Sequence, residues 1–203
     1  MVDVADTELS RAELRRAQVL DASILCFGRS GFHGASMADI ATEASMSVGQ
    51  IYRYFANKEA IIAAIVERDM QEASKLRDIL RQGGDGVEEL IQVARYKIEH
   101  VRDPIRAALS LEILAEAARN PRVAEIVRSA EEIGRGWLRE MLERRGYGQD
   151  NLLEARMDMI ALLIEGWTSR VVKNPNADHE AYVASLRQIL TALLVECKSG
   201  ACG

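Results

Sequence analysis

The sequence lacks most of the patterns that mark enzymes and metalloproteins. It has 203 residues but only three histidines, His33, His100 and His179, and none lies at metal-ligand spacing from another histidine or an acid. It contains no nucleophile elbow, phosphate-binding glycine loop, HExxH pair or Glu-x-x-His pair. We therefore expect a protein that is not an enzyme and that needs no cofactor or metal.

Cysteine and long apolar runs are also scarce. The three cysteines are odd in number and lack metal-site spacing, and Cys26 lies on an apolar helical face, where we expect a core residue. The sequence shows no secretory signal, no apolar run long enough for a membrane helix and no lipidation motif. These absences predict a cytoplasmic protein without a membrane partner.

Few prolines and aromatic residues accompany a high content of helix-forming residues. There are 3 prolines, 5% aromatic residues and 48% hydrophobic residues, and no strand-like alternation is found. We expect an all-α fold of about nine helices. The net charge is −5, and residues 1–60 carry 6 basic against 8 acidic side chains, so binding to nucleic acid would require local placement of positive charge.

The most specific pattern lies at residues 36–59. Ser36 with Asp39, and Ser47 with Gln50, have the spacing of two helix N-caps with capping boxes. Residues 44–47 between the two predicted helices leave room only for a sharp corner. This is the layout of a helix-turn-helix, whose second helix enters the major groove of DNA.

The second of these helices has side chains suited to DNA. If Ile51 and Phe55 face the core, the polar residues between them point outward, and Gln and Arg are the side chains that pair with adenine and guanine. The predicted base contacts are Gln50 and Arg53, the predicted phosphate contacts are Ser36, Ser47, Tyr52, Tyr54 and Lys58, and Val48 and Gly49 would approach the groove. The alternative is an amphipathic helix pair that only packs.

The stretch from about Arg16 to Ile62 closely resembles the DNA-binding domain of the TetR family of transcriptional regulators. The matching residues are Ala22, Phe27, Gly31, Phe32, Ser36, Met37, Ala38, Asp39, Ile40, Ala41, Ala44, Ser47, Gly49, Tyr52, Tyr54, Phe55, Lys58 and Glu59. The family usually has glycine where Ser45 stands, because that corner residue tends to be left-handed. A serine there costs on the order of 1 kcal/mol.

Composition and the resemblance together predict two domains. We expect a disordered tail over residues 1–9, an N-terminal three-helix helix-turn-helix domain over 10–56, a helical regulatory domain for ligand binding and dimerisation over 57–198, and a flexible tail over 199–203. The resemblance implies that the helix beginning near Asn57 joins the two domains. The glycine-rich stretch 83–86 reads as a break after that helix.

The last two predicted helices, 151–172 and 178–197, are apolar on more than one side, which favours a partner. The resemblance implies a homodimer in which these helices form a four-helix bundle. The predicted contacts are Met159, Leu163, Trp167, Leu186, Ile189, Leu190, Leu193 and Leu194. The alternative is that they form a core within one chain.

The resemblance also implies a small-molecule pocket in the middle helices. Carboxylates beside aromatic and methionine side chains suit a flat or cationic apolar ligand, and the candidates are Tyr96, Glu112, Glu116, Trp137, Met141, Glu165 and Trp167. The alternative pairs Glu116 with Arg119, leaves Glu112 facing water and sets Glu165 against an arginine at the dimer edge.

These features predict a sequence-specific DNA-binding regulator. We expect a ligand-responsive repressor that binds a palindromic double-stranded DNA operator as a homodimer and is released by a small apolar or cationic effector. The alternative is an all-helical small-molecule-binding or adaptor protein without sequence-specific DNA binding.

Overall fold

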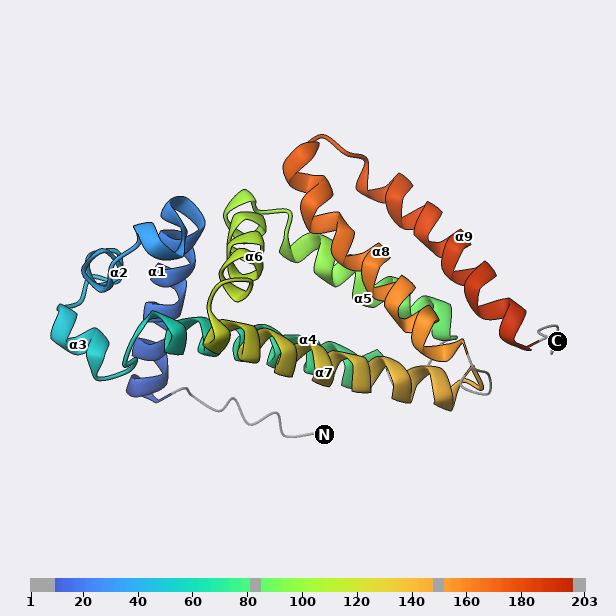
Figure 1. The fold of residues 1–203 in the computed structure, drawn as a ribbon, viewed down its shortest axis with the longest axis horizontal. Helices are drawn as coiled ribbons and strands as arrows, with labels where there is room; N and C mark the ends of the chain where they lie inside the picture. The colour runs from blue at the N-terminus through green and yellow to red at the C-terminus, as the bar shows by residue number, and fades with distance from the viewer. Residues whose placement is uncertain (1–9, 81–84, 148–151, 199–203) are drawn as a thin grey trace, which may run out of the picture.

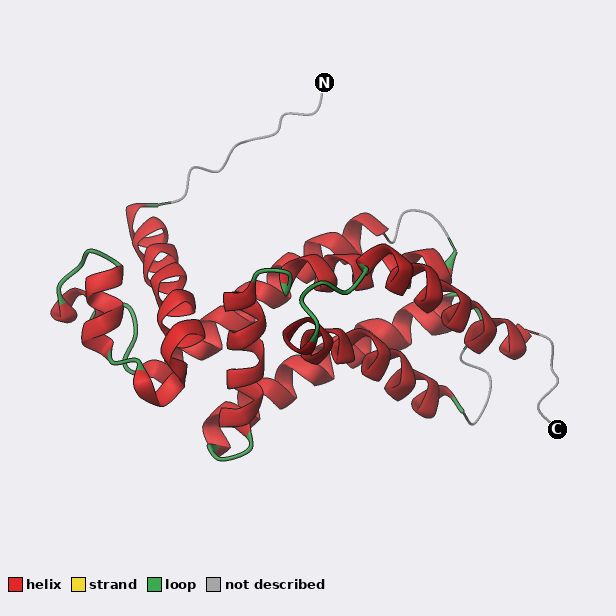
Figure 2. Cartoon of the chain, turned by 90° about the horizontal axis from the view of Figure 1, so that it is seen from above, coloured by secondary structure: helices red, strands yellow, loops and turns green. Residues whose placement is uncertain are grey.

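The computed structural model describes residues 10–80, 85–147 and 152–198, and over these residues it contains nine α-helices and no strand (Figure 2). The expected all-α fold is therefore confirmed, whereas the two predicted tails lie outside the described residues. No helix of the described part is long and apolar enough to cross a membrane. The helices are α1 (Arg11–Gly34), α2 (Met37–Glu43), α3 (Val48–Tyr52), α4 (Lys58–Leu80), α5 (Gly86–His100), α6 (Pro104–Ala117), α7 (Pro121–Arg144), α8 (Leu153–Lys173) and α9 (His179–Lys198).

The first three helices lie at one end of an elongated molecule (Figure 1). Helix α4 leads away from them and runs beside α7, while α6 stands between α1 and the group formed by α5, α8 and α9. Helix α6 contacts α1, α7 and α8, and α4 contacts α1, α5 and α7, so both helices link the N-terminal helices to the C-terminal ones.

The N-terminal core extends beyond the first three helices. Phe27, Ile40 and Ile51 are buried in it, and the first turns of α4 add Ile61 and Ile65. Helices α6 and α7 complete this core with the buried side chains Leu109 and Val123. Each fully buried Ile or Phe contributes roughly 1.5–3 kcal/mol. The boundary expected at residue 56 therefore falls within a continuous apolar core.

Helices α1 and α6 approach each other closely at Gly28. A Cβ atom at this position would lie 2.5 Å from Ile105 Cγ2 and 2.8 Å from the Ile105 carbonyl oxygen. Three residues later Gly31, with φ +72°, breaks the helical path of α1 before its last turn. One further helical turn follows Gly31, up to Gly34.

The C-terminal core lies between α5, α7, α8 and α9. Half of the residues predicted as dimer contacts are buried in it. Trp167, Leu186, Leu190 and Leu194 are 2%, 1%, 0% and 0% exposed within the single chain. The prediction that these four lie at a dimer interface is corrected: the apolar stripe on α9 is needed first for the core of its own chain. Leu163 and Leu193 are half-buried, whereas Met159 and Ile189 are exposed.

Candidate nucleic-acid interface and effector cavity

Two reciprocal capping boxes set the start of α2 and α3. The Ser36 hydroxyl accepts from Asp39 N–H at 3.1 Å, and the Asp39 carboxylate accepts from Ser36 N–H at 2.8 Å. At the next helix Ser47 Oγ accepts from Gln50 N–H at 3.2 Å, and Gln50 Oε1 accepts from Ser47 N–H at 2.9 Å. Hydrogen bonds from the Ser36 side chain and backbone lower the pKa of Asp39. Both predicted caps are confirmed, and they define the orientation of α3.

The corner between α2 and α3 is a Schellman motif built on Ser45. Ser45 N–H donates to Thr42 O at 3.0 Å and Met46 N–H donates to Ala41 O at 2.9 Å, the two bonds that close such a helix end. Ser45 itself has φ 52°, so the left-handed corner residue expected from the resemblance is present. The Gln18 side chain of α1 donates to Ala44 O at 2.7 Å and ties this corner to the rest of the domain.

Helix α3 presents an open face to solvent. Ile51 is 0% and Phe55 2% exposed, so they hold the helix against the core as predicted, while Val48 is 39% and Tyr52 53% exposed. A Cβ atom at Gly49 would meet nothing within 4 Å, so no described residue covers this position. A short helix with an apolar anchor and an exposed Tyr is shaped for contact with a groove.

Most of the predicted DNA-contacting residues are exposed to solvent. They are Ser36, Ser47, Val48, Gly49, Gln50, Tyr52 and Arg53. Tyr54 is half-buried and packs against the N-terminal core. Because Gln50 Oε1 already caps Ser47 N–H, a bidentate contact with adenine would require this oxygen to accept a second hydrogen bond or to release the cap. The DNA contacts themselves stay predictions.

Lys58 is engaged inside the domain. Its Nζ donates to the carbonyl oxygens of Phe32 and Ala35, the latter at 2.9 Å, and lies 4.4 Å from the centre of the Phe32 ring. These contacts fix the chain between α1 and α2. Since its ammonium has three internal partners, we leave Lys58 out of the proposed interface, and its predicted phosphate contact remains untested.

Two carboxylates of α6 hold the last turn of α1. Glu112 Oε1 accepts from Phe32 N–H at 2.7 Å, and the His33 ring lies 2.9 Å from Glu116 Oε2. Glu116 is only 2% exposed and also meets Arg119 at 3.5 Å and Asn120 at 3.0 Å. Burial by itself would raise its pKa, but the Asn120 hydrogen bond and the His33 and Arg119 charges bring the pKa of Glu116 below its usual value.

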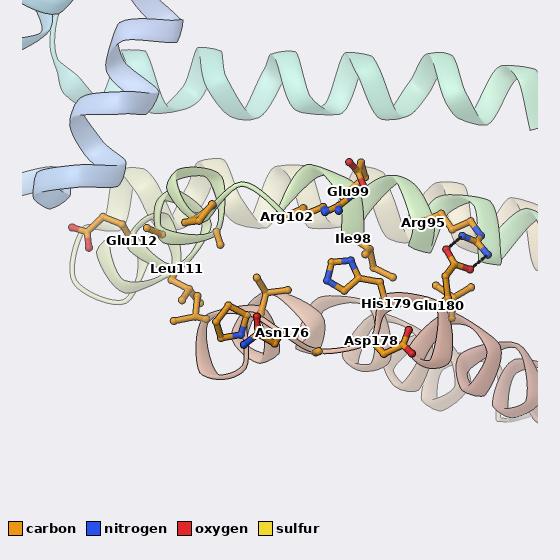
Figure 3. Close-up of a pocket in the computed structure, with 18 of the residues that line it drawn as sticks. Arg95, Ile98, Glu99, Arg102, Leu111, Glu112, Asn176, Asp178, His179 and Glu180 are labelled. Atoms are coloured by element: carbon orange, nitrogen blue, oxygen red, sulfur yellow. Dashed lines mark hydrogen bonds and ion pairs between the residues drawn. The ribbon is translucent and has the colours of Figure 1, made fainter.

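A cavity of about 1470 Å³ lies between α5, α6, the end of α8 and the segment leading into α9. Its apolar lining includes Ile98, Leu111 and Val183. Figure 3 shows Glu112 at the end of the cavity nearest α1, and the ion pair of Arg95 with Glu180, 2.7 Å apart, at the opposite end. The cavity therefore combines an apolar wall with charged groups at both ends, which suits a ligand with a polar end.

Of the predicted ligand-binding residues, only Glu112 lines this cavity. The other six predicted positions lie outside this cavity, and their part in ligand binding stays a prediction. The ring of Trp137 packs against Arg77 of α4, 4.7 Å from the guanidinium carbon, and Tyr96 donates to Glu72 of α4 at 3.1 Å. Met141 and Trp167 belong to the C-terminal core, Glu116 faces α1, and Glu165 is exposed on α8.

Comparison with known proteins agrees with this geometry. Residues 19–65 match the profile of the family described as bacterial regulatory proteins, tetR family. The solved structure of Salmonella enterica GusR is 30% identical, and the match covers 92% of this chain and 98% of GusR with a TM-score of 0.74. The chain belongs to the TetR family.

Other similarities extend over different shares of the chain. The HTH-type transcriptional regulator UidR of Escherichia coli K12 is 33% identical over 135 residues, which is 64% of this chain and 63% of UidR. The match thus spans less than two thirds of that regulator. The fatty acid degradation regulator FadR of Bacillus halodurans is 25% identical, covers 89% of this chain and 94% of FadR, and has a TM-score of 0.71.

The structure adds one basic side chain to the TetR-family surface around α3. The guanidinium carbon of Arg16 lies 4.5 Å from the centre of the Phe55 ring, just behind α3, and Arg16 is exposed. The sequence shows three arginines at the start of α1, but only the fold reveals which of them reaches this ring. The cavity residues 175–178 were also missed, because they come from the loop before α9, which has no helical periodicity.

Proposed function

We propose that this TetR-family chain is a ligand-responsive transcriptional regulator, a repressor that binds a palindromic operator as a homodimer. The observation that carries the proposal is the exposed face of α3, with Val48, Gly49 and Tyr52 uncovered on a helix whose position is held by two capping boxes and a Schellman corner. Its relatives UidR and BetI are HTH-type transcriptional regulators, which supports the same function.

Local placement of charge supports DNA contact in spite of the acidic chain. Arg53, the residue after α3, and Arg16, which packs on the Phe55 ring, are both exposed, and the acid Asp39 is tied to its own helix cap. Because few cations are present, we expect a shallow salt dependence of the DNA affinity, with sequence readout from α3 supplying the specificity.

The test is selection of bound duplexes from a random DNA library, followed by anisotropy titrations with variants. An enriched inverted repeat is expected, because two α3 helices would occupy successive major grooves. R53A should lower the affinity for the selected site by about tenfold and relax the base preference at one position per half-site. The control R128A removes an exposed arginine of α7, far along the chain, and should bind as the wild type does. Recovery of unenriched DNA would instead favour the small-molecule-binding or adaptor protein.

The surface for dimerisation that we propose is the exposed apolar side of α8 and α9. Met159, Leu162 and Ile189 are 47%, 65% and 44% exposed in the single chain. Three large apolar side chains on two neighbouring helices are the kind of patch that a second copy buries. L162D should shift the mass measured by light scattering to that of a monomer, whereas L114D, at a 57% exposed leucine of α6, should not. A dimer that survives L162D would refute this placement.

Coupling between the cavity and α3 would pass through Glu112. This side chain lines the cavity and accepts from Phe32 N–H at 2.7 Å, and the segment from Phe32 leads directly to the Ser36 cap of α2. An effector that presents an N–H or cationic group to Glu112 would compete for the same carboxylate. The last turn of α1 would then be released from α6, which changes the placement of the helix-turn-helix.

This coupling can be tested without knowing the effector. E112A should speed hydrogen exchange at the Phe32 amide and change operator affinity severalfold. The control E99A removes another carboxylate of the cavity lining, one that pairs with Arg102 of the same segment, and should leave both values unchanged. A Phe32 amide equally protected in E112A and wild type would rule out this route.

A further inference from the structure

A histidine and two carboxylates meet where α4 passes α5. Asp69 and Glu72 are three residues apart and so share one face of α4, and His100 is the last residue of α5. One possible ligand atom from each of the three lies within 4.8 Å of the other two. This cluster is separate from both α3 and the cavity.

The spacing of these atoms resembles that of ligands around one ion. Asp69 Oδ2 lies 3.6 Å from His100 Nε2. Two ligands held about 2.0–2.2 Å from a tetrahedral Zn²⁺ are roughly 3.3–3.6 Å apart. The pair is therefore already spaced for a shared cation, and only Glu72, an exposed side chain on α4, has to turn inward.

The guanidinium of Arg106 already lies beside Asp69 and His100, where a metal ion would bind. Arg106 Nη1 of α6 lies 3.4 Å from Asp69 Oδ1 and 3.4 Å from His100 Nε2, at the long limit for hydrogen bonds. A guanidinium can only donate, so it hydrogen-bonds Nε2 only in the tautomer that leaves a lone pair there, which is also the tautomer in which Nε2 binds a metal. Arg106 thus points to the cation position and would compete for it.

A second interaction orients the outer carboxylate. The Tyr96 hydroxyl, on α5, donates to Glu72 Oε2 at 3.1 Å. Outer hydrogen bonds of this kind hold metal-binding carboxylates in place.

We propose that Asp69, Glu72 and His100 form a binding site for a divalent transition metal of the Zn²⁺ class, with Arg106 as an internal competitor. One imidazole and two carboxylates suit Zn²⁺ or Co²⁺, and the two carboxylate charges match the charge of the ion. A bound ion would connect α4 to α5, which makes the arrangement of these helices dependent on metal. The site does not require the proposed DNA function.

The experiment is titration of the full chain with Co²⁺, followed by visible absorption, and with Zn²⁺, followed by calorimetry. The wild type should bind one ion per chain and show the d–d bands of a low-coordinate nitrogen and oxygen site. H100Q and E72Q should each lower the affinity by about tenfold or more. R106Q should bind more tightly than the wild type, because the competing cation is gone.

The matched control is H33Q. His33 also lies against a carboxylate, Glu116, at 2.9 Å, but no second carboxylate completes a metal-binding cluster there among the described residues. H33Q should therefore bind as the wild type does, and circular dichroism confirms that each variant is folded. The proposal is overturned if the wild type takes up no metal at micromolar concentration, if H33Q lowers the affinity as much as H100Q, or if R106Q binds more weakly. A thiolate-to-Co²⁺ charge-transfer band would also overturn it, since it would assign the metal to cysteine.

Discussion

The corner at Ser45 offers a direct test of how α3 is positioned, because the chain contains a glycine counterpart of the same motif. At the end of α7, Gly146 N–H donates to Glu143 O at 3.0 Å and Tyr147 N–H donates to Leu142 O at 2.9 Å. Gly146 has φ +81° where Ser45 has φ 52°. One Schellman motif thus ends on glycine and the other on serine, and exchanging the two residue types should have opposite effects on stability.

The magnitude follows from two opposing terms. An L-residue in the left-handed region costs about 1–2 kcal/mol, whereas glycine loses more conformational entropy on folding, by roughly 0.5–1 kcal/mol. S45G should therefore raise the free energy of unfolding by about 0.5–1 kcal/mol. For a chain of this length the midpoint of thermal unfolding should rise by about 1–4 °C. G146S should lower it by a similar amount, since a Cβ atom there meets nothing within 4 Å and only the backbone term changes.

Both variants can be measured by thermal and urea unfolding at one fixed protein concentration, since a dimer would make the midpoint concentration-dependent. The reasoning is refuted if G146S destabilises the chain as expected while S45G leaves the midpoint unchanged or lower. In that case the Ser45 side chain would offset the backbone cost by contacts of its own. Operator binding of S45G should equal that of the wild type, because the corner geometry is kept.

Further predictions concern the junction between the N-terminal helices and α6. The lowered pKa of Glu116 contributes stability that is present above the pKa of an unfolded glutamate, about 4.3, and is lost as the pH falls through the lower folded value. Urea unfolding between pH 7 and pH 3 should therefore show a smaller loss of stability for E116Q than for the wild type, and an equal loss would contradict this. G28A should cost about 1–3 kcal/mol, because a backbone oxygen 2.8 Å away cannot retreat. G134A, where a Cβ meets nothing within 4 Å, should instead gain about 0.5–1 kcal/mol in the same unfolding assay, and a G28A chain as stable as G134A would disprove the close contact.

The elements that sequence predicts well here are those set by local chemistry. Ser36 and Ser47 begin helices where their side chains cap them, as the sequence predicts. The left-handed corner at Ser45 is likewise a property of neighbouring residues. Such features depend on hydrogen bonds within a few residues, so the pattern of side chains is enough to locate them.

Features that depend on which helix packs against which were not accessible in this way. Trp137 is an aromatic residue on a middle helix, but its ring packs against the guanidinium of Arg77 on α4. Trp167 is buried in the C-terminal core. His100 has no metal-binding spacing along the sequence, yet the fold sets it beside Asp69, 31 positions earlier in the chain. Only the path of α4 past α5 brings these two together.

The shared core between α1 and α6 also bears on how hybrid regulators of this kind can be assembled. A chimera that joins the first 56 residues to the body of a relative would transplant Phe27 and Gly28 without Leu109, Val123 and the backbone at Ile105 that they meet. The graft would leave either a void or a clash beneath the helix-turn-helix. A functional chimera must include the inner face of α6 and the start of α7 along with the helix-turn-helix. The residues to be exchanged are therefore those that share a packing interface, and they are not contiguous in sequence.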